Sequence, residues 1–316
     1  MATAQPMWEQ VLLPPELLHG ATVESLHDTF ARQAPTGPRG IGRASRHRGP
    51  AVNPFALKLS ILMPVYNEEA NVARAVGEVL KVDYPCAMEL IVVDDGSTDG
   101  TYDRLAMVDD DRVTVYRHEA RQGKGAALLT AASLATGSYI VPFNADLEYS
   151  AEDIPRLMTP VLKGRCSVVY GTRISGRNTV YHSYRSARGN RLLTRLANVL
   201  FDACVSDLHT CLKLVPRATF DELALREPGS GLDIELTASL LKRGVRPFEV
   251  PVTYCSRSHS QGKKVSWRDA VACARILLRV RMWRAPAESA DHQRQYGRTY
   301  DAPVIVANQP TMPGAC

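Results

Sequence analysis

Two groups of residues in this 316-residue sequence have the types and spacing to do chemistry. The first is polar and acidic: Asp94-Asp95 and Asn144-Ala145-Asp146 each follow a short apolar run that is typical of a buried strand. The second is basic: in the segment RSHSQGKK (257–264), Arg257, Lys263 and Lys264 are clustered with a glycine. Clustered cations of this kind can hold a phosphate or diphosphate, and the alternative interpretation of the segment is a solvated loop.

Alternating strands and helices are expected to position these residues. Apolar runs predict strands over residues 59–65, 89–93, 113–116, 139–143 and 167–170, and helical periodicity predicts helices over 69–80, 125–134 and 151–162, with a further helix starting near 97–99. This order predicts an α/β fold with a mostly parallel sheet and helices on both faces. Ligands bind such sheets beyond the carboxyl ends of the strands, where the polar clusters fall.

Composition and local patterns bound the remaining possibilities. The chain is 45% hydrophobic and 22% charged, which is ordinary for a globular protein. It has no apolar run of 18 residues and no basic-then-apolar N-terminus, so we expect neither a transmembrane helix nor a secretory signal. Its 7 cysteines include no CxxC pair, which argues against a disulfide framework or zinc ribbon and favours a cytoplasmic protein.

Four segments are expected along the chain. Residues 1–57 and 285–316 are rich in proline and polar residues, which predicts a loosely packed extension and a flexible tail. Residues 58–265 form the predicted catalytic domain, and 266–284 a basic amphipathic helix. Neither the P-loop pattern GxxxxGK[ST] nor a GxGxxG after the first strand is present, so two common nucleotide-binding folds are excluded.

The motifs of residues 58–284 resemble the glycosyltransferase family 2 domain, and those at the C-terminal end its polyprenyl-phosphate sugar synthase branch. They are PVYNEE (64–69), VVDDGSTDGT (92–101), RQGKGAA (121–127), NADLEY (144–149), YGTR (170–173), TCLKLVPR (210–217), LDIEL (232–236) and VPVTYCSRSHSQGKKVSWRD (250–269). The resemblance implies a single catalytic domain with the Rossmann-like GT-A fold. It also implies a UDP- or GDP-sugar as donor.

The resemblance also implies a Mg²⁺ or Mn²⁺ ion that neutralises charge on the departing diphosphate. The family holds this ion with a D-x-D motif at the end of the fourth strand. Asp146 matches the second aspartate, Ala145 lies between, and Asn144 replaces the first. We therefore expect weaker metal affinity, or metal that binds mainly with the donor. The alternative is a loop amide beside a helix-capping aspartate.

Further donor contacts follow from the same resemblance. The nucleoside pocket is expected to be lined by Pro64, Tyr66, Asn67 and Glu68. Either Asp95 or Asp94 would accept hydrogen bonds from the base edge. Lys124 lies between two glycines that would let the backbone approach a ligand closely, although it could also be a surface lysine. Arg173 would contact the sugar or a phosphate, or else pair with an acid.

On the acceptor side, Asp233 and Glu235 match the family's acidic position at the start of a helix. A hydroxyl acceptor needs such a base, whereas a phosphate is already ionised and would leave both residues to cap the helix. Arg257 and Lys263 would hold a lipid phosphate or the donor diphosphate.

We therefore expect an inverting, metal-dependent glycosyltransferase that moves a hexosyl or N-acetylhexosaminyl group from the nucleotide sugar to polyprenyl phosphate. The helix at 266–284 would contact the inner membrane face peripherally, or would pack on the protein or a partner. Two alternatives stay open: a small-molecule hydroxyl acceptor in natural-product or nucleoside-antibiotic biosynthesis, or a homologue that binds nucleotide sugar without turnover. The sequence has no basic, aromatic-interleaved surface, so nucleic acid is not expected as a partner.

Overall fold

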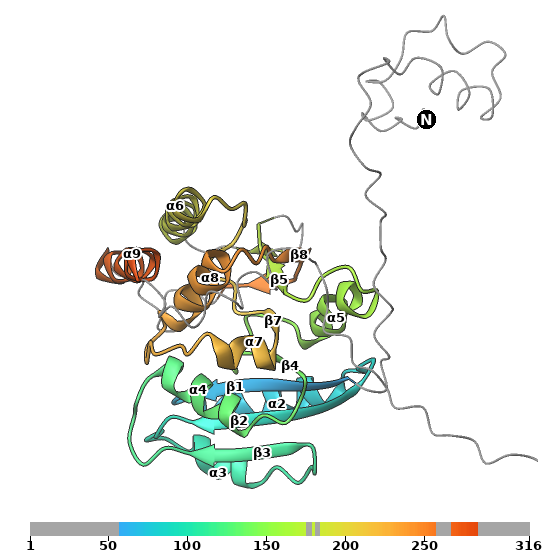
Figure 1. The fold of residues 1–316 in the computed structure, drawn as a ribbon. Coiled ribbons are helices and arrows are strands. Elements are labelled where there is room, and N and C mark those ends of the chain that lie inside the picture. The colour runs from blue at the N-terminus through green and yellow to red at the C-terminus, as the bar shows by residue number, and fades with distance from the viewer. Residues whose placement is uncertain (1–56, 175–178, 181–183, 257–266, 284–316) are drawn as a thin grey trace, which may run out of the picture. The chain divides into compact units, whose positions relative to one another are not determined.

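A seven-stranded sheet organises the protein, for which a computed structural model describes residues 57–174, 179–180, 184–256 and 267–283 (Figure 1). All of these residues lie in one compact unit, Arg48–Cys316. The strand order is β3-β2-β1-β4-β7-β5-β8, and a separate two-stranded sheet pairs β6 with β9. The strands are β1 (Lys58–Val65), β2 (Ala87–Asp94), β3 (Val113–Arg117), β4 (Tyr139–Pro142), β5 (Val169–Thr172), β6 (Thr179–Val180), β7 (Lys213–Pro216), β8 (Phe248–Pro251) and β9 (Tyr254–Cys255).

The four strands from β3 to β4 are parallel, and their side chains alternate between two apolar cores. In β1, Leu59, Ile61 and Met63 contribute to one core, while Leu62 contributes to the other. The first core is covered by α2 (Val72–Lys81), α3 (Thr101–Ala106) and α5 (Ile154–Leu162), and the second by α4 (Lys124–Leu134), α7 (Arg217–Glu222) and α8 (Leu232–Lys242). The predicted α/β class, with a mostly parallel sheet and helices on both faces, is confirmed.

Parallel pairing brings the carboxyl ends of β1, β2 and β4 to one edge of the sheet. Val65 of β1 is in register with Asp94 of β2, and Leu62 with Pro142 of β4. The loops that follow these strands therefore start side by side. They contain the two polar clusters singled out in the sequence, Asp94-Asp95 and 144–146.

β7 is the one strand of the large sheet that runs antiparallel to its neighbours, β4 and β5. The apolar-run criterion did not predict it, because the strand begins with a lysine, Lys213. That lysine is fully buried, on the same side of the strand as Val215.

Three helices enclose a third apolar core beside the sheet. They are α6 (Tyr184–Phe201), α8 and α9 (Trp267–Met282), and α6 and α9 pack on each other and on α8 (Figure 1). α9 coincides with the basic helix predicted at 266–284, whereas α6 was not predicted. Within the described ranges, no helix is at once long enough and apolar enough to cross a bilayer.

Candidate active site

The loops after β1 and β2 are joined by hydrogen bonds of Asn67, one of the residues predicted to line the nucleoside pocket. Asn67 has a left-handed backbone conformation, with φ 51°. Its backbone N–H donates to Ser97 Oγ at 2.9 Å, and its side-chain oxygen accepts from the Thr98 N–H at 2.9 Å. Ser97 therefore joins the two loops instead of capping α3, where Asp99 accepts from the Thr101 N–H at 3.1 Å. Asn67 therefore helps to hold the two loops together.

The paired aspartates at the end of β2 are both buried and bound by the protein itself. Asp95 accepts from the backbone N–H groups of Gln122 and Gly123, each at 2.8 Å, and lies 2.8 Å from His118 Nδ1. Asp94 accepts from the Ser97 N–H at 3.0 Å and forms an ion pair with Arg117 at 3.3 Å. In this structure the two carboxylates shape the neighbouring loops.

The remaining predicted nucleoside residues lie at the end of β1 and on the loop that follows it. Pro64 is half-buried near the end of β1. The Tyr66 ring lies beneath the Arg121 guanidinium, 4.1 Å from its carbon to the ring centre. Glu68 accepts from the Asn71 side chain at 2.8 Å.

The glycines around Lys124 allow a close backbone approach, but the approaching group is Pro228 of the same chain. Gly123 has φ 111°, and a Cβ there would lie 2.5 Å from the Pro228 carbonyl oxygen. A Cβ on Gly125 would lie 2.2 Å from the Glu227 carbonyl oxygen. Both glycines therefore pack closely against a segment of the protein itself, and the expectation that they let the backbone approach a ligand stays a prediction. They let α4 begin directly against the loop that precedes α8.

This packing brings Lys124 to Asp233 and to the loop after β4. Lys124 Nζ lies 3.3 Å from Asp233 Oδ2, across 109 residues of sequence. Burial opposes the charge on Lys124, yet Asp233, Cys211 and Asp146 together raise its pKa above the usual range. Burial would also raise the pKa of Asp233, but Lys124 and Lys213 lower it. Both groups are therefore charged at neutral pH.

Asn144 and Asp146 form the third side of this site. The Asn144 amide nitrogen donates to Asp146 Oδ2 at 3.3 Å, and its oxygen accepts from the buried Cys211 thiol at 3.3 Å. Asp146 Oδ1 accepts from the Glu148 N–H at 3.2 Å, and Ala145 between them is buried. We call Lys124, Asn144, Asp146 and Asp233 the charge cluster.

The charge cluster offers few ligands to a metal ion. Among the described residues, no group of three or more His, Cys, Asp or Glu side chains could hold one. Mg²⁺, however, is usually bound through one or two carboxylates plus substrate phosphates and water. Asp146, with the Asn144 amide turned to present its oxygen, fits that kind of site, which the donor's diphosphate would complete.

The two predicted acids of α8 point to different partners. Asp233 joins the charge cluster. Glu235 accepts from the backbone N–H groups of Arg226 and Glu227, at 2.9 and 2.8 Å, and pairs with Arg279 of α9 at 3.0 Å. Glu235 therefore fastens the loop before α8 and the helix α9. Arg257 and Lys263 lie outside the described residues.

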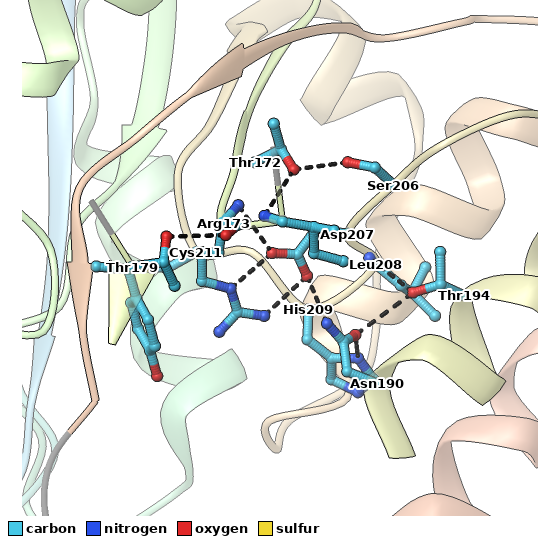
Figure 2. A network of polar contacts seen from close by, with 12 residues as sticks. Thr172, Arg173, Thr179, Asn190, Thr194, Ser206, Asp207, Leu208, His209 and Cys211 are labelled. Carbon is cyan, nitrogen blue, oxygen red and sulfur yellow. Dashed lines mark hydrogen bonds and ion pairs between the residues drawn. The ribbon is translucent and has the colours of Figure 1, made fainter. Parts of the chain in front are cut away.

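Arg173 belongs to a second, largely buried set of polar residues around the fully buried Asp207 (Figure 2). Its guanidinium forms two bonds to Asp207, at 2.6 and 2.8 Å. Asn190 of α6 donates to the same carboxylate at 2.8 Å, and its amide oxygen lies 2.8 Å from His209 Nδ1. Arg173, Asn190, Asp207 and His209 are called the arginine network below. Of the two predicted interpretations of Arg173, the structure has the pairing with an acid.

In the arginine network, the positive charge of Arg173 balances the negative charge of Asp207. Burial alone would raise the pKa of Asp207, but the Arg173 guanidinium lowers it. Burial, with the charges of Lys213 and Arg173, lowers the pKa of His209 to about 4, so this imidazole is neutral at pH 7.

Lys213 links the arginine network to the charge cluster. Its ammonium donates to the carbonyl oxygens of Leu208 and Asp233, at 3.1 and 2.6 Å. Burial lowers its pKa to about 8, although Asp233 and Asp207 oppose that shift. Sequence reasoning missed Asp207, His209 and Lys213. The only available signal was a lysine inside an otherwise apolar run, TCLKLVP (210–216).

Comparisons with known proteins identify the family of the chain. The family model described as Glycosyl transferase family 2 matches residues 60–224, more than half of the chain. A polyprenol monophosphomannose synthase of Mycolicibacterium smegmatis is 28% identical over 207 residues, which cover 62% of this chain and 77% of that protein. The low-salt glycan biosynthesis hexosyltransferase Agl6 of Haloferax volcanii is 29% identical over 71% of this chain, and the match spans only 54% of Agl6.

Solved structures show the same fold. Glucosyl-3-phosphoglycerate synthase from Mycobacterium tuberculosis, solved in complex with Mn²⁺, UDP and phosphoglyceric acid, aligns with a TM-score of 0.53 and 21% identity. The alignment covers 73% of this chain and 80% of that one. The predicted GT-A architecture is therefore confirmed.

Proposed function

The chain belongs to glycosyltransferase family 2, and from this premise we propose that it transfers a sugar from a nucleotide diphosphate sugar to polyprenyl phosphate, with inversion. The match to a polyprenol monophosphomannose synthase supports the acceptor. The donor would lie across the ends of β1, β2 and β4, its nucleoside near Tyr66 and its diphosphate near the charge cluster.

The observation that carries the choice of acceptor is the state of the two acids on α8. Asp233 is ion-paired to Lys124 and its pKa is lowered, which makes it a weak proton acceptor. Glu235 is engaged by two backbone N–H groups and Arg279. A hydroxyl acceptor would need one of these carboxylates as a base. A phosphate acceptor is already ionised and needs neither, so the arrangement favours polyprenyl phosphate over a hydroxyl compound.

Lys124 would then provide charge stabilisation at the leaving group. Its ammonium is held by Asp233 at one side of the cluster, and the negative charge of Asp146 also stabilises its charged form. Held there, it would oppose the negative charge that develops on the diphosphate as the glycosidic bond breaks. A Mg²⁺ or Mn²⁺ ion bound with the donor by Asp146 and Asn144 would neutralise the same charge.

A transfer assay tests this function. The purified chain is incubated with UDP- and GDP-hexoses and N-acetylhexosamines, Mn²⁺ and polyprenyl phosphate, and sugar is counted in the chloroform phase. We expect a lipid-extractable product with one donor class. Asp146→Ala should abolish it, whereas Asp83→Ala, a matched change at an exposed position after α2, should not.

Two results would contradict the proposal. Sugar transfer to a soluble hydroxyl compound, with no lipid product, would show that polyprenyl phosphate is not the acceptor. Donor binding without transfer to any acceptor would indicate that the protein is a homologue that binds nucleotide sugar without turnover. Thermal shift with UDP-, GDP- and dTDP-sugars, with and without Mn²⁺, reports donor binding independently of turnover, because a ligand of the folded state stabilises it by mass action.

A further inference from the structure

The outward face of α6 is both basic and apolar. The helix contains no aspartate or glutamate. Among the α6 side chains that the structure describes, the exposed ones are Tyr184, Arg188, Arg191, Leu192, Arg195 and Val199. At the helical repeat these six fall within a sector of about 100°, and the residues of the opposite sector, such as Leu193 and Ala197, enter the third core.

Two of these residues are unusually exposed for aliphatic side chains. Leu192 is 68% exposed and Val199 is 81% exposed, one on each side of Arg195. Single exposed aliphatic residues are common on protein surfaces. Here they are two turns apart on one face and alternate with three arginines, which is the pattern of a helix that lies in a lipid interface.

The neighbouring helix α9 has an exposed face of the same kind. It packs against α6 around the third core (Figure 1). Its exposed residues include Val271, Arg275, Leu278 and Met282. These four lie within about 60° of one helical face, again with a cation between apolar side chains. The only acid in α9 is Asp269, in its first turn.

We propose that the outer faces of α6 and α9 together form a docking surface for an anionic lipid bilayer. Charge complementarity favours this partner: each arginine near an anionic surface adds attraction, and the aliphatic side chains add the apolar contact that stable peripheral binding requires. A nucleic acid would use the arginines but not Leu192, Val199 and Leu278. The proposal rests on the lipid acceptor only for its biological purpose, since a membrane-bound acceptor must be reached from the bilayer surface.

The two helices that carry this surface also contact the arginine network and α8 through their inner faces. Asn190, on the inner face of α6, donates to Asp207 of the arginine network, and Arg279 of α9 pairs with Glu235 of α8. Because the same two helices carry the outer surface and these inner contacts, docking would hold the acceptor side of the protein against the membrane.

Vesicle co-sedimentation of the full chain tests the surface. The vesicles contain phosphatidylcholine alone or with about 30% phosphatidylglycerol. We expect binding only to the anionic vesicles, and weaker binding as salt rises. Arg191→Glu/Arg195→Glu and, separately, Leu192→Ser/Val199→Ser should each weaken binding about tenfold or more. The matched controls are Arg74→Glu/Lys81→Glu on α2 and Met107→Ser, at exposed positions on the other side of the sheet, and these should bind as the unaltered chain does.

The outcomes separate this proposal from the proposed function. Equal vesicle binding by the α6 variants and the unaltered chain would overturn the surface. The surface would also be overturned if the α6 variants lost only nucleic acid binding, or only self-association measured by sedimentation velocity, and kept their binding to vesicles. Transfer to a short, water-soluble polyprenyl phosphate should be unchanged in Leu192→Ser/Val199→Ser. Absence of that transfer in every form, with vesicle binding intact, would instead reject the acceptor assigned above.

Discussion

The charge cluster and the arginine network are built from similar side chains but differ in charge balance. In the arginine network, one guanidinium faces one carboxylate: Arg173, whose side chain is 11% exposed, pairs with the fully buried Asp207. In the charge cluster, the single cation Lys124 lies in the field of two carboxylates, Asp233 and Asp146. A balanced and buried pair serves the fold. A partly exposed cluster with excess negative charge is suited to receive a cation together with an anionic substrate.

The largest effect is expected from breaking the balanced pair. Asp207→Ala leaves the Arg173 guanidinium buried without its counter-charge, which should lower the free energy of unfolding by about 3–5 kcal/mol. Urea denaturation measures this loss. Arg74→Ala, which breaks an exposed pair with Glu78, should cost less than about 1 kcal/mol. If the two variants lost equal stability, the arginine network would not be the structural element inferred here.

A second prediction concerns Asp95, one of the two neighbouring aspartates that were expected from the sequence to contact the nucleobase. Asp95→Ala would leave the N–H groups of Gln122 and Gly123 and the His118 ring without their acceptor. Buried donors left unpaired are costly, so the loss of stability should be about 3 kcal/mol even without donor. Unchanged stability with a raised KM for the nucleotide sugar would show that Asp95 serves the ligand instead of the loop.

The parts of this molecule that the sequence could predict are those in which local pattern decides the outcome. β1 and β2 are buried on both faces, so their continuous apolar runs identify them within one or two residues. β7 escaped because Lys213, a residue rarely buried, opens it. α6 escaped because its exposed face mixes arginine with leucine and valine, which blurs the helical period.

Long-range pairing explains what was missed at the site. Motif resemblance identified Lys124, Asp146 and Asp233 separately, but no local pattern tells that Lys124 meets Asp233 across 109 residues. Local sequence patterns also do not predict that Arg173 pairs with Asp207, 34 residues away, or that Glu235 pairs with Arg279. Such contacts depend on how helices pack on the sheet. The tertiary structure therefore decides whether an acid in a motif is a ligand, a base or an anchor.

A third prediction uses Lys213, which touches both regions. Its pKa is about 8 in the folded protein and 10.5 in the unfolded chain. Between these values the unfolded chain binds more protons, so the stability contributed by Lys213 rises with pH across this window and its penalty is greatest below pH 8. Relative to Lys213→Met, the unaltered chain should gain about 2 kcal/mol from pH 8 to 10.

Urea denaturation of both forms at the two pH values measures this gain. Lys81→Met, at an exposed position on α2, is the matched control and should show no such pH-dependent difference. A constant difference between the Lys213 variant and the unaltered chain across the window would mean that Lys213 keeps its ordinary pKa.

The smallest effect is expected from increasing the imbalance of the charge cluster. Asn144→Asp replaces the amide that donates to Asp146 with a second carboxylate. Without metal the two carboxylates repel, and a divalent ion relieves that repulsion, so Mn²⁺ should bind about tenfold more tightly, or about 1.4 kcal/mol. Calorimetric titration of Mn²⁺ with saturating donor measures the change. Asp146→Asn should shift affinity in the opposite direction, because it removes the carboxylate of the Asn144–Asp146 pair. Equal affinity in all three forms would place the metal elsewhere, and the excess negative charge of the cluster would then serve only to orient Lys124.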